Sequence, residues 1–148
     1  MTDYHGAEEA FIDEWVRQKL VAHTAFNVLF AGLTSRVFDR YAPSGTAYPF
    51  IIFQAQSPPD VVRGVGDAEV MVDTIYIVKA VAQASSFAPL ANVAAAIRTA
   101  MVYPNGDSIT GGSIFTCRYE KQFSMVEPES TKQYRHLGGE FRIQAQAS

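Results

Sequence analysis

Hydrophobic positions in the first part of the chain recur with helical spacing. Between Glu8 and Ala22 the apolar side chains fall three and four residues apart on one stripe, and most charged residues fall on the other faces. Glu9 lies near the start of this stretch and Lys19 near its end, an order that suits the helix macrodipole. The pattern therefore predicts an amphipathic helix over Glu8–Ala22 that buries one face.

From about Arg36 onward the hydrophobic period changes to that of extended strands. In Glu69–Ala82, apolar side chains occupy both alternating faces, which is typical of a central strand covered on both sides at least in part. Clusters of proline, glycine and asparagine separate the extended stretches from one another. Extended segments are predicted at Arg36–Tyr41, Pro49–Gln56, Glu69–Ala82, Ser113–Val126 and Gln133–Gln146.

A second helix is predicted between two of these segments. Ser85 or Ser86 can cap it, and an apolar, alanine-rich stripe from Leu90 to Met101 lets a thin helix lie flat on a sheet. The order of elements favours an α+β fold, namely a mostly antiparallel sheet of about four or five strands, with a helix packed on it and an N-terminal amphipathic helix. Residues 1–148 are expected to form a single domain, in which residues 1–7 are a candidate flexible tail.

Composition narrows the classes of ligand and partner. The chain has 148 residues, and 12 Lys+Arg against 15 Asp+Glu give a net charge of −3, so it lacks the basic excess of nucleic-acid-binding proteins. Charged residues make up 18%, below the roughly 25% of ordinary soluble domains, which favours contacts between subunits. No apolar run is long enough to span a membrane, and the acidic start does not match a secretory signal. Synthesis in the cytoplasm and no membrane contact are expected.

The residue types that carry catalysis or bind metals are sparse. Cys117 is the one cysteine, and the three histidines lack the spacing of a metal site, so no metal or cofactor is expected. A nucleophile–base pair of Cys117 with His136 is conceivable, although a buried hydrophobic cysteine is the more ordinary interpretation. Gly64–Asp67 lacks the lysine and the following helix of a phosphate-binding loop. The sequence therefore does not predict an enzyme.

The segment Ser57–Ala68 is a long loop between two strands, bounded by prolines, and such loops are uncommon unless they bind something. Exposed apolar side chains at its tip would favour a protein partner, whereas the alternative is that its valines fold back onto the core of the domain. Charges around the turn after Ser113–Val126 form a second candidate surface, for which solvated rim charges are the ordinary interpretation. The expected interface residues are Val61, Val62, Arg63, Val65, Asp67, Glu127, Glu129 and Lys132.

A short motif resembles a known family. The run Arg36-Val37-Phe38-Asp39-Arg40-Tyr41-Ala42-Pro43, followed by Tyr48-Pro49-Phe50-Ile51-Ile52-Phe53, resembles the start of tail completion proteins of long-tailed bacteriophages, also called tail terminators. In that family an early helix, this segment, a long strand, a helix and two closing strands follow one another, and the order matches from about Glu8 to Ala147. Two segments depart from the pattern of this family. One is the acidic N-terminal segment Met1–Glu9, and the other is Thr74–Val78, where many relatives carry a tryptophan.

The resemblance implies a structural virion protein that needs no catalysis and no cofactor. A hexameric ring would cap the tail tube, stop its polymerisation and join the tail to the head-side connector or stopper protein. Its partners would be copies of itself, the tail tube protein and that connector, at the junction of tail and neck. The acidic charge suits a lumen through which DNA passes without specific binding. We expect Val61–Asp67 to reach a neighbouring subunit or the tube.

Two other functions remain open at this point. Another neck component, such as a head-completion or head–tail joining protein, would share the ring but dock on the portal side. A small α+β ligand-binding or enzyme domain would instead use a pocket, for which Arg118, Glu120 and His136 form a candidate polar face. Because one scaffold can host many functions, fold alone does not separate these alternatives.

Overall fold

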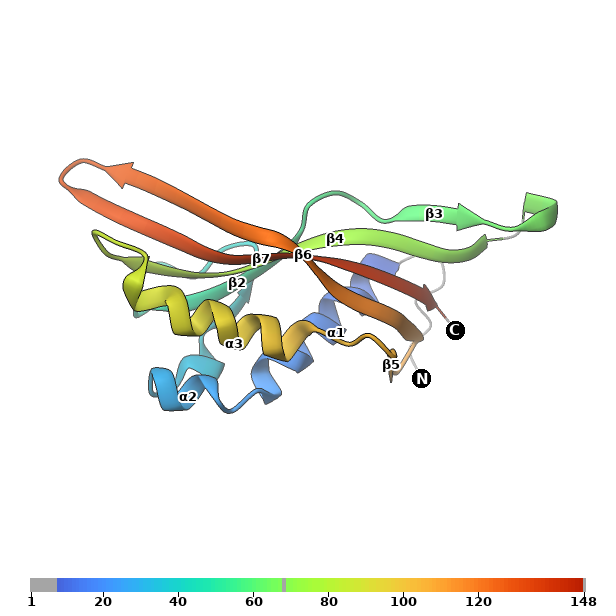
Figure 1. Ribbon diagram of the computed structural model, residues 1–148, viewed down its shortest axis with the longest axis horizontal. Coiled ribbons are helices and arrows are strands. Elements are labelled where there is room, and N and C mark those ends of the chain that lie inside the picture. Colours follow the sequence, from blue (N-terminus) through green and yellow to red (C-terminus); the bar gives the residue numbers. More distant parts are fainter. Residues whose placement is uncertain (1–7, 68, 148) are drawn as a thin grey trace.

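The computed structural model describes residues 8–67 and 69–147, so the candidate tail at residues 1–7 lies outside the described residues. Within these ranges the chain forms one curled, half-barrel sheet of seven strands (Figure 1). The strands follow one another across the sheet as β1 (Val37–Asp39), β2 (Phe50–Ala55), β4 (Glu69–Gln83), β7 (Lys132–Ala147), β6 (Gly112–Glu129) and β5 (Asp107–Ile109), and β3 (Asp60–Arg63) pairs with β4.

The prediction of a sheet of about four or five strands is wrong. Strand accounts for 47% of the molecule and helix for 28%, so the fold is richer in sheet than expected. β3 forms inside the segment predicted as a loop, and β5 forms where no extended segment was predicted. Both strands are too short to show an alternating pattern, and their pairing comes from the long strands beside them. β1 also lies parallel to β2, whereas the other pairs of strands are antiparallel.

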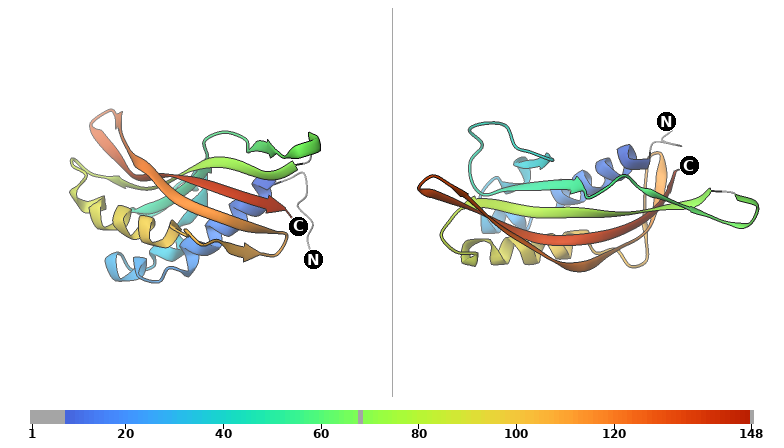
Figure 2. Two further views of the ribbon diagram at one scale, coloured as in Figure 1. Left: turned by 45° about the vertical axis from the view of Figure 1, so that its right-hand side comes forward. Right: turned by 90° about the horizontal axis from the view of Figure 1, so that it is seen from above.

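The helices α1 (Glu8–Ala22), α2 (Phe26–Leu29) and α3 (Ala91–Met101) all lie on one side of the sheet (Figures 1 and 2). The bounds predicted for the first helix are confirmed. α3 corresponds to the helix predicted between two strands, and it begins later than the serines that were predicted to cap it. The reason is that Pro89 lies in a 3-10 turn, Ala88–Leu90, which leads into α3. No helix of the described chain covers the opposite face of the sheet, which is called the open face below.

The core lies between the helices and one face of the central strands. Alternate residues of β4, including Val72, Tyr76 and Val78, are buried in a single cluster with Phe11 and Trp15 of α1. The indole N–H of Trp15 donates a hydrogen bond of 3.0 Å to the carboxylate of Asp107 at β5. This bond connects the first helix to β5 at one edge of the sheet.

Candidate assembly surfaces

The expected interface residues lie in two groups at opposite ends of the sheet, and the structure does not bring the groups together. One group is on the hairpin formed by β3 and the start of β4, here called the arm, and the other is at the turn between β6 and β7 (Figure 1). The arm carries Val61, Val62, Arg63 and Val65, and the β6–β7 turn carries Glu127, Glu129 and Lys132. The side chain of Asp67 lies outside the part of the chain that the structure describes.

The arm exposes apolar side chains beyond the layer of helices. Val65 at its tip is 103% exposed, and Val61 and Val70 are each 45% exposed. The alternative that the loop valines fold back onto the core therefore does not hold for Val61 and Val65. β3 pairs with β4 in antiparallel register, with Val61 opposite Val72, and Gly66 with φ of 78° helps the chain to reverse. An exposed apolar tip of this kind is typical of a contact with another protein.

The β6–β7 turn is a second projecting hairpin, and its character is more polar. Ser130, with φ of 56°, reverses the chain, and Glu129 lies opposite Lys132 in the strand register. Both of these charged residues are exposed, as are the apolar side chains of Met125 and Val126. The end of this hairpin therefore presents mixed charges beside an exposed apolar stretch.

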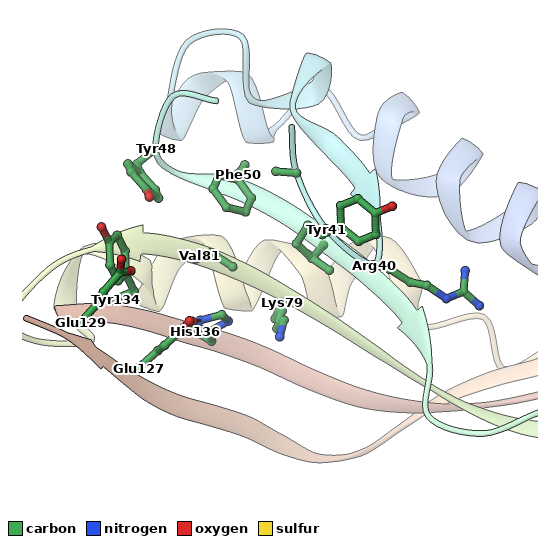
Figure 3. Close-up of a pocket in the computed structure, with 12 residues that line it drawn as sticks. Arg40, Tyr41, Tyr48, Phe50, Lys79, Val81, Glu127, Glu129, Tyr134 and His136 are labelled. Atoms are coloured by element: carbon green, nitrogen blue, oxygen red, sulfur yellow. Dashed lines mark hydrogen bonds and ion pairs between the residues drawn. The ribbon is translucent and has the colours of Figure 1, made fainter. Parts of the chain in front are cut away.

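A groove of about 260 Å³ lies on the open face, between the connection from β1 to β2 and strands β4, β7 and β6 (Figure 3). The aromatic rings of Tyr48, Phe50 and Tyr134 lie together in one part of the groove. The ring of Tyr48 stacks on that of Phe50 with centroids 5.4 Å apart, and it lies 5.8 Å from the ring of Tyr134. The lining residues are Arg40, Tyr41, Ala42, Tyr48, Phe50, Ile52, Lys79, Val81, Glu127, Glu129, Tyr134 and His136.

Burial shifts the pKa values of two ionisable side chains in this groove, His136 and Lys79. His136 is 7% exposed, and its Nε2 lies 3.0 Å from a carboxylate oxygen of Glu127. Its Nδ1 has no hydrogen-bond partner among the residues that the structure describes. Burial lowers the pKa of His136, and the nearby Lys79 ammonium lowers it further, while Glu127 opposes both effects. Burial also lowers the pKa of Lys79, whose ammonium lies 5.2 Å from the centre of the Phe123 ring. His136 is therefore expected to be neutral at pH 7.

Farther along the open face, an arginine connects carboxylates from two other strands. Arg142 of β7 donates hydrogen bonds of 3.0 Å to both carboxylate oxygens of Asp73 on β4, and another to Glu120 on β6. Arg118 lies 3.8 Å from Glu120. The sequence did not identify this network, because recognising it requires the register between three strands. The only local signal was the alternation of charged residues along each strand.

The geometry does not support the catalytic arrangements that the sequence left open. Cys117 is fully buried in the core beneath the helices, where burial raises the pKa of its thiol, whereas His136 lies on the open face. The two side chains therefore do not form a nucleophile–base pair. Arg118 and Glu120 lie beside Arg142, and neither lines the groove that contains His136, so these three residues do not form one pocket.

Neither a metal site nor a membrane-spanning helix is present in the residues that the structure describes. No three His, Cys, Asp or Glu side chains in these ranges lie together as metal ligands. No helix in them is both long enough and apolar enough to cross a membrane. The candidate surfaces are the arm, the β6–β7 turn and the groove on the open face.

Known proteins resemble the chain both in sequence and in fold. A family model described as "Tail completion protein gp17" matches residues 14–145. No curated protein matches the chain. Among solved structures, a chain of "Virion of native gene transfer agent (GTA) particle" matches with a TM-score of 0.61 and 17% identity, over 87% of this chain and 91% of that chain. At this identity the likeness shows the fold alone.

Proposed function

The chain belongs to the family of tail completion proteins, which are structural components of phage tails, and we propose that it caps the tail tube as a hexameric ring. In this proposal the ring sits on the last ring of tube subunits, stops their polymerisation and presents its other face to the head-side connector. The role is structural, with no catalytic step and no cofactor. Its place in the virion is the junction between tail and neck.

The observation that carries the proposal is the family match over residues 14–145, which extends from within α1 into β7 and so includes most of the residues that form the core. The solved virion chain with the same fold fits a role in particle assembly. A closed ring also needs two different patches on each subunit, because its contacts are heterologous. The arm and the opposite end of the sheet offer two such patches with different chemistry.

The arm is the part of the molecule that we assign to a contact with a neighbouring subunit or with the tube. Val61 and Val65 are exposed there, and Val62 is half-buried beside them. Burying such side chains at an interface removes apolar surface from water, which is the main favourable contribution to most protein–protein association. The contact therefore depends on the arm being apolar and on its projecting beyond the helices.

Charges on the subunit fit a lumen that lets DNA pass without binding it specifically. The formal net charge is −3. Several basic side chains lie beside carboxylates. Arg40 lies 2.8 Å from Glu9, and Lys121 lies 3.6 Å from Glu140. A cation whose charge is offset by a neighbouring carboxylate attracts DNA phosphates less strongly than a free one.

The test begins with the purified protein in solution. Light scattering over a concentration series, with negative-stain images, is expected to show rings, or rings that form when tail tubes are added. The variant in which Val61, Val62 and Val65 are all replaced by serine should attach to tubes at least about tenfold more weakly, because several exposed valines lose buried area. Val28→Ser is the matched control, since Val28 is 86% exposed on α2, away from the arm.

The possible outcomes distinguish an error in the proposed ring function from an error in the role assigned to the arm. A protein that stays monomeric at every concentration and with tubes present would remove the proposed function. Rings that bind a portal-side protein but not tubes would identify a different neck component instead. Unchanged attachment of the triple serine variant would reject the role of the arm and leave the ring in place.

A further inference from the structure

The outer side of β6 is an open strand edge over most of its length. β5 pairs only with Gly112–Ile114, and an isolated bridge joins Tyr103 to Cys117. From Arg118 to Glu129 no strand of the described chain pairs with this side of β6. A long open edge presents unpaired backbone N–H and C=O groups, which form a template for a strand from another chain.

The alternation of backbone hydrogen bonds along the strands shows which N–H and C=O groups of β6 face away from β7. The N–H of Ala84 donates to the carbonyl of Gln133 at 3.1 Å, so the odd-numbered residues of β7 bond to β4 and the even-numbered residues bond to β6. The even-numbered residues of β7 lie opposite odd-numbered residues of this part of β6, as His136 lies opposite Met125. These odd-numbered residues of β6 therefore direct their backbone groups toward β7. Three residues of β6 between the bulge and the turn therefore direct their N–H and C=O groups outward, namely Gln122, Ser124 and Val126.

Pro128 supports this assignment. It occupies the next outward-facing position along β6, where a residue without an N–H loses no bond to β7. Proline at this position also ends the usable edge close to the β6–β7 turn. The free edge therefore consists of the stretch from Arg118 to Val126, and part of its surface is apolar, since Met125 is 39% and Val126 is 41% exposed.

A hollow of about 330 Å³ lies beside this edge, on the side of the sheet covered by α3. Alanines form its helical wall, and the guanidinium of Arg98 lies 4.0 Å from the centre of the Tyr119 ring at its border. Because alanine side chains are short, a side chain from an added strand can enter between α3 and β6. The residues lining the hollow are Ala91, Ala94, Ala95, Arg98, Tyr119, Gln122, Leu137 and Gly138.

The opposite side of the sheet has an open edge with matching features. The N–H of Gln56 donates to the carbonyl of Ile75 at 2.8 Å, so the odd-numbered residues of β4 bond toward the side that carries β2 and β3. In β3, Val61 lies opposite Val72, an even-numbered residue, so the backbone groups of Val61 point away from β4. Its side chain is on the same face as the buried Val72 and is 45% exposed.

We propose that β3 of one copy of this chain pairs with the β6 edge of a second copy, with the side chain of Val61 in the hollow beside α3. β3 runs antiparallel to β4, β4 to β7, and β7 to β6, so β3 and β6 meet as antiparallel strands when the sheet continues from copy to copy. Backbone bonds then supply affinity and the side-chain hollow supplies specificity. The proposal rests on the proposed ring, because the contact joins two different edges and is heterologous.

The first test removes one outward N–H from the β6 edge. Ser124→Pro deletes this donor without breaking the ladder to β7, whereas Ser124→Ala keeps the donor and is the matched control. We expect the proline variant to weaken assembly at least about tenfold by light scattering, since the pairing loses a backbone bond and meets the proline ring. Ser124→Ala should assemble as the wild type does. Circular dichroism of the dilute subunits checks that both variants fold.

A second test detects the contact directly and does not depend on the proline variant folding. Val61→Cys combined with Ser124→Cys should form disulfides between copies under mild oxidation, giving a ladder of oligomers on a denaturing gel. The neighbouring outward positions Gln122→Cys and Val126→Cys test the alternative registers. The control pair is Val28→Cys with Ser124→Cys. Cys117 is fully buried, so it does not compete.

The results distinguish this contact from the ring itself. Rings that form with Ser124→Pro, together with no cross-link at any of the three registers, would overturn the edge contact and leave the proposed function standing. Ser124→Pro rings that assemble normally but no longer bind tubes would show that the edge serves a different protein, which also overturns the proposal. Wild-type protein that forms no ring under any condition would remove the proposed function as well.

Discussion

Gly138 lies in β7 directly beside the backbone of β4. A Cβ atom at this position would be 2.0 Å from the carbonyl oxygen of Val78 and 2.6 Å from the Cα of Lys79. Both obstacles are backbone atoms in the centre of the sheet, so neither can move without disturbing the ladder. The absence of a side chain at Gly138 is therefore a requirement of strand packing.

Gly138→Ala is expected to lower the free energy of unfolding by about 1–3 kcal/mol, the usual effect of overpacking a core. Gly139→Ala is the matched control, because its Cβ would meet the side chains of Tyr119 and Phe141 instead of backbone. We expect a smaller loss there, measured by urea denaturation of both variants. Equal losses would contradict the assignment of the effect to the backbone of β4.

His136 should make stability depend on pH. Burial holds the pKa of His136 in the folded protein below its ordinary value, so the unfolded chain takes up a proton at a higher pH than the folded chain does. The stability associated with the neutral ring is present above about pH 6.5, the ordinary value, and is lost as pH falls toward the lower pKa of the folded state.

Comparing the wild type with His136→Gln isolates this effect from the titration of carboxylates. Between pH 7 and pH 5 the free energy of unfolding of the wild type should fall more steeply than that of the variant. Chemical denaturation at several pH values measures both slopes. Parallel slopes would show that His136 does not titrate differently in the folded and unfolded states.

At the scale of elements, a partly buried hydrogen bond attaches α1 to the central strand β4. The hydroxyl of Tyr76 on β4 donates to the carboxylate of Asp13 on α1, and Tyr76 is fully buried. Burial is the main cause that raises the pKa of both groups. Helical spacing places Asp13 within α1, whereas its contact with a distant strand follows only from the packing of α1 on the sheet.

Tyr76→Phe should destabilise the fold by about 1–3 kcal/mol, because it leaves the partly buried carboxylate of Asp13 without its donor. Thermal denaturation of Tyr76→Phe, Asp13→Ala and the double variant gives the coupling between the two side chains. A double variant that loses as much as the sum of the single variants would show that the bond contributes nothing.

Elements with a long pattern were the ones that the sequence predicted well. The fifteen residues of α1 show four turns of helical spacing, and β4, β6 and β7 alternate over long stretches, so their positions follow from local residues. β3 and β5 contain four and three residues, and they become strands only because a long neighbour offers an edge. The error in the number of strands therefore arises from pairing, which is not a local property.

At the scale of the whole molecule, some candidate surfaces follow from local sequence patterns and others depend on how the strands pair. The arm could be predicted as a projecting segment because prolines, glycines and valines lie together within Ser57–Ala68. The groove around His136 and the free edge of β6 could not, because each depends on the register of several strands and on where the sheet ends. The short motif beginning at Arg36 pointed to the correct family although these surfaces were not identified.

The alternation of backbone groups along β6 leads to a prediction that spans the free subunit and the assembled ring. In the free subunit, amides that bond to β7 are protected from solvent, whereas the amides of the outward positions Gln122, Ser124 and Val126 meet water. Hydrogen exchange followed by NMR should therefore alternate between slow and fast from one residue to the next, with Phe123 and Met125 slow.

Assembly should remove this alternation if a second copy covers the edge. The outward amides are then expected to exchange at least about tenfold more slowly, while Phe123 and Met125 change little because they are already bonded within the subunit. Exchange of assembled rings, quenched and dissociated before detection, measures the difference. Outward amides that stay fast in a ring confirmed by electron microscopy would mean that the subunits join through surfaces other than the β6 edge, and the proposed pairing of β3 with β6 would be wrong.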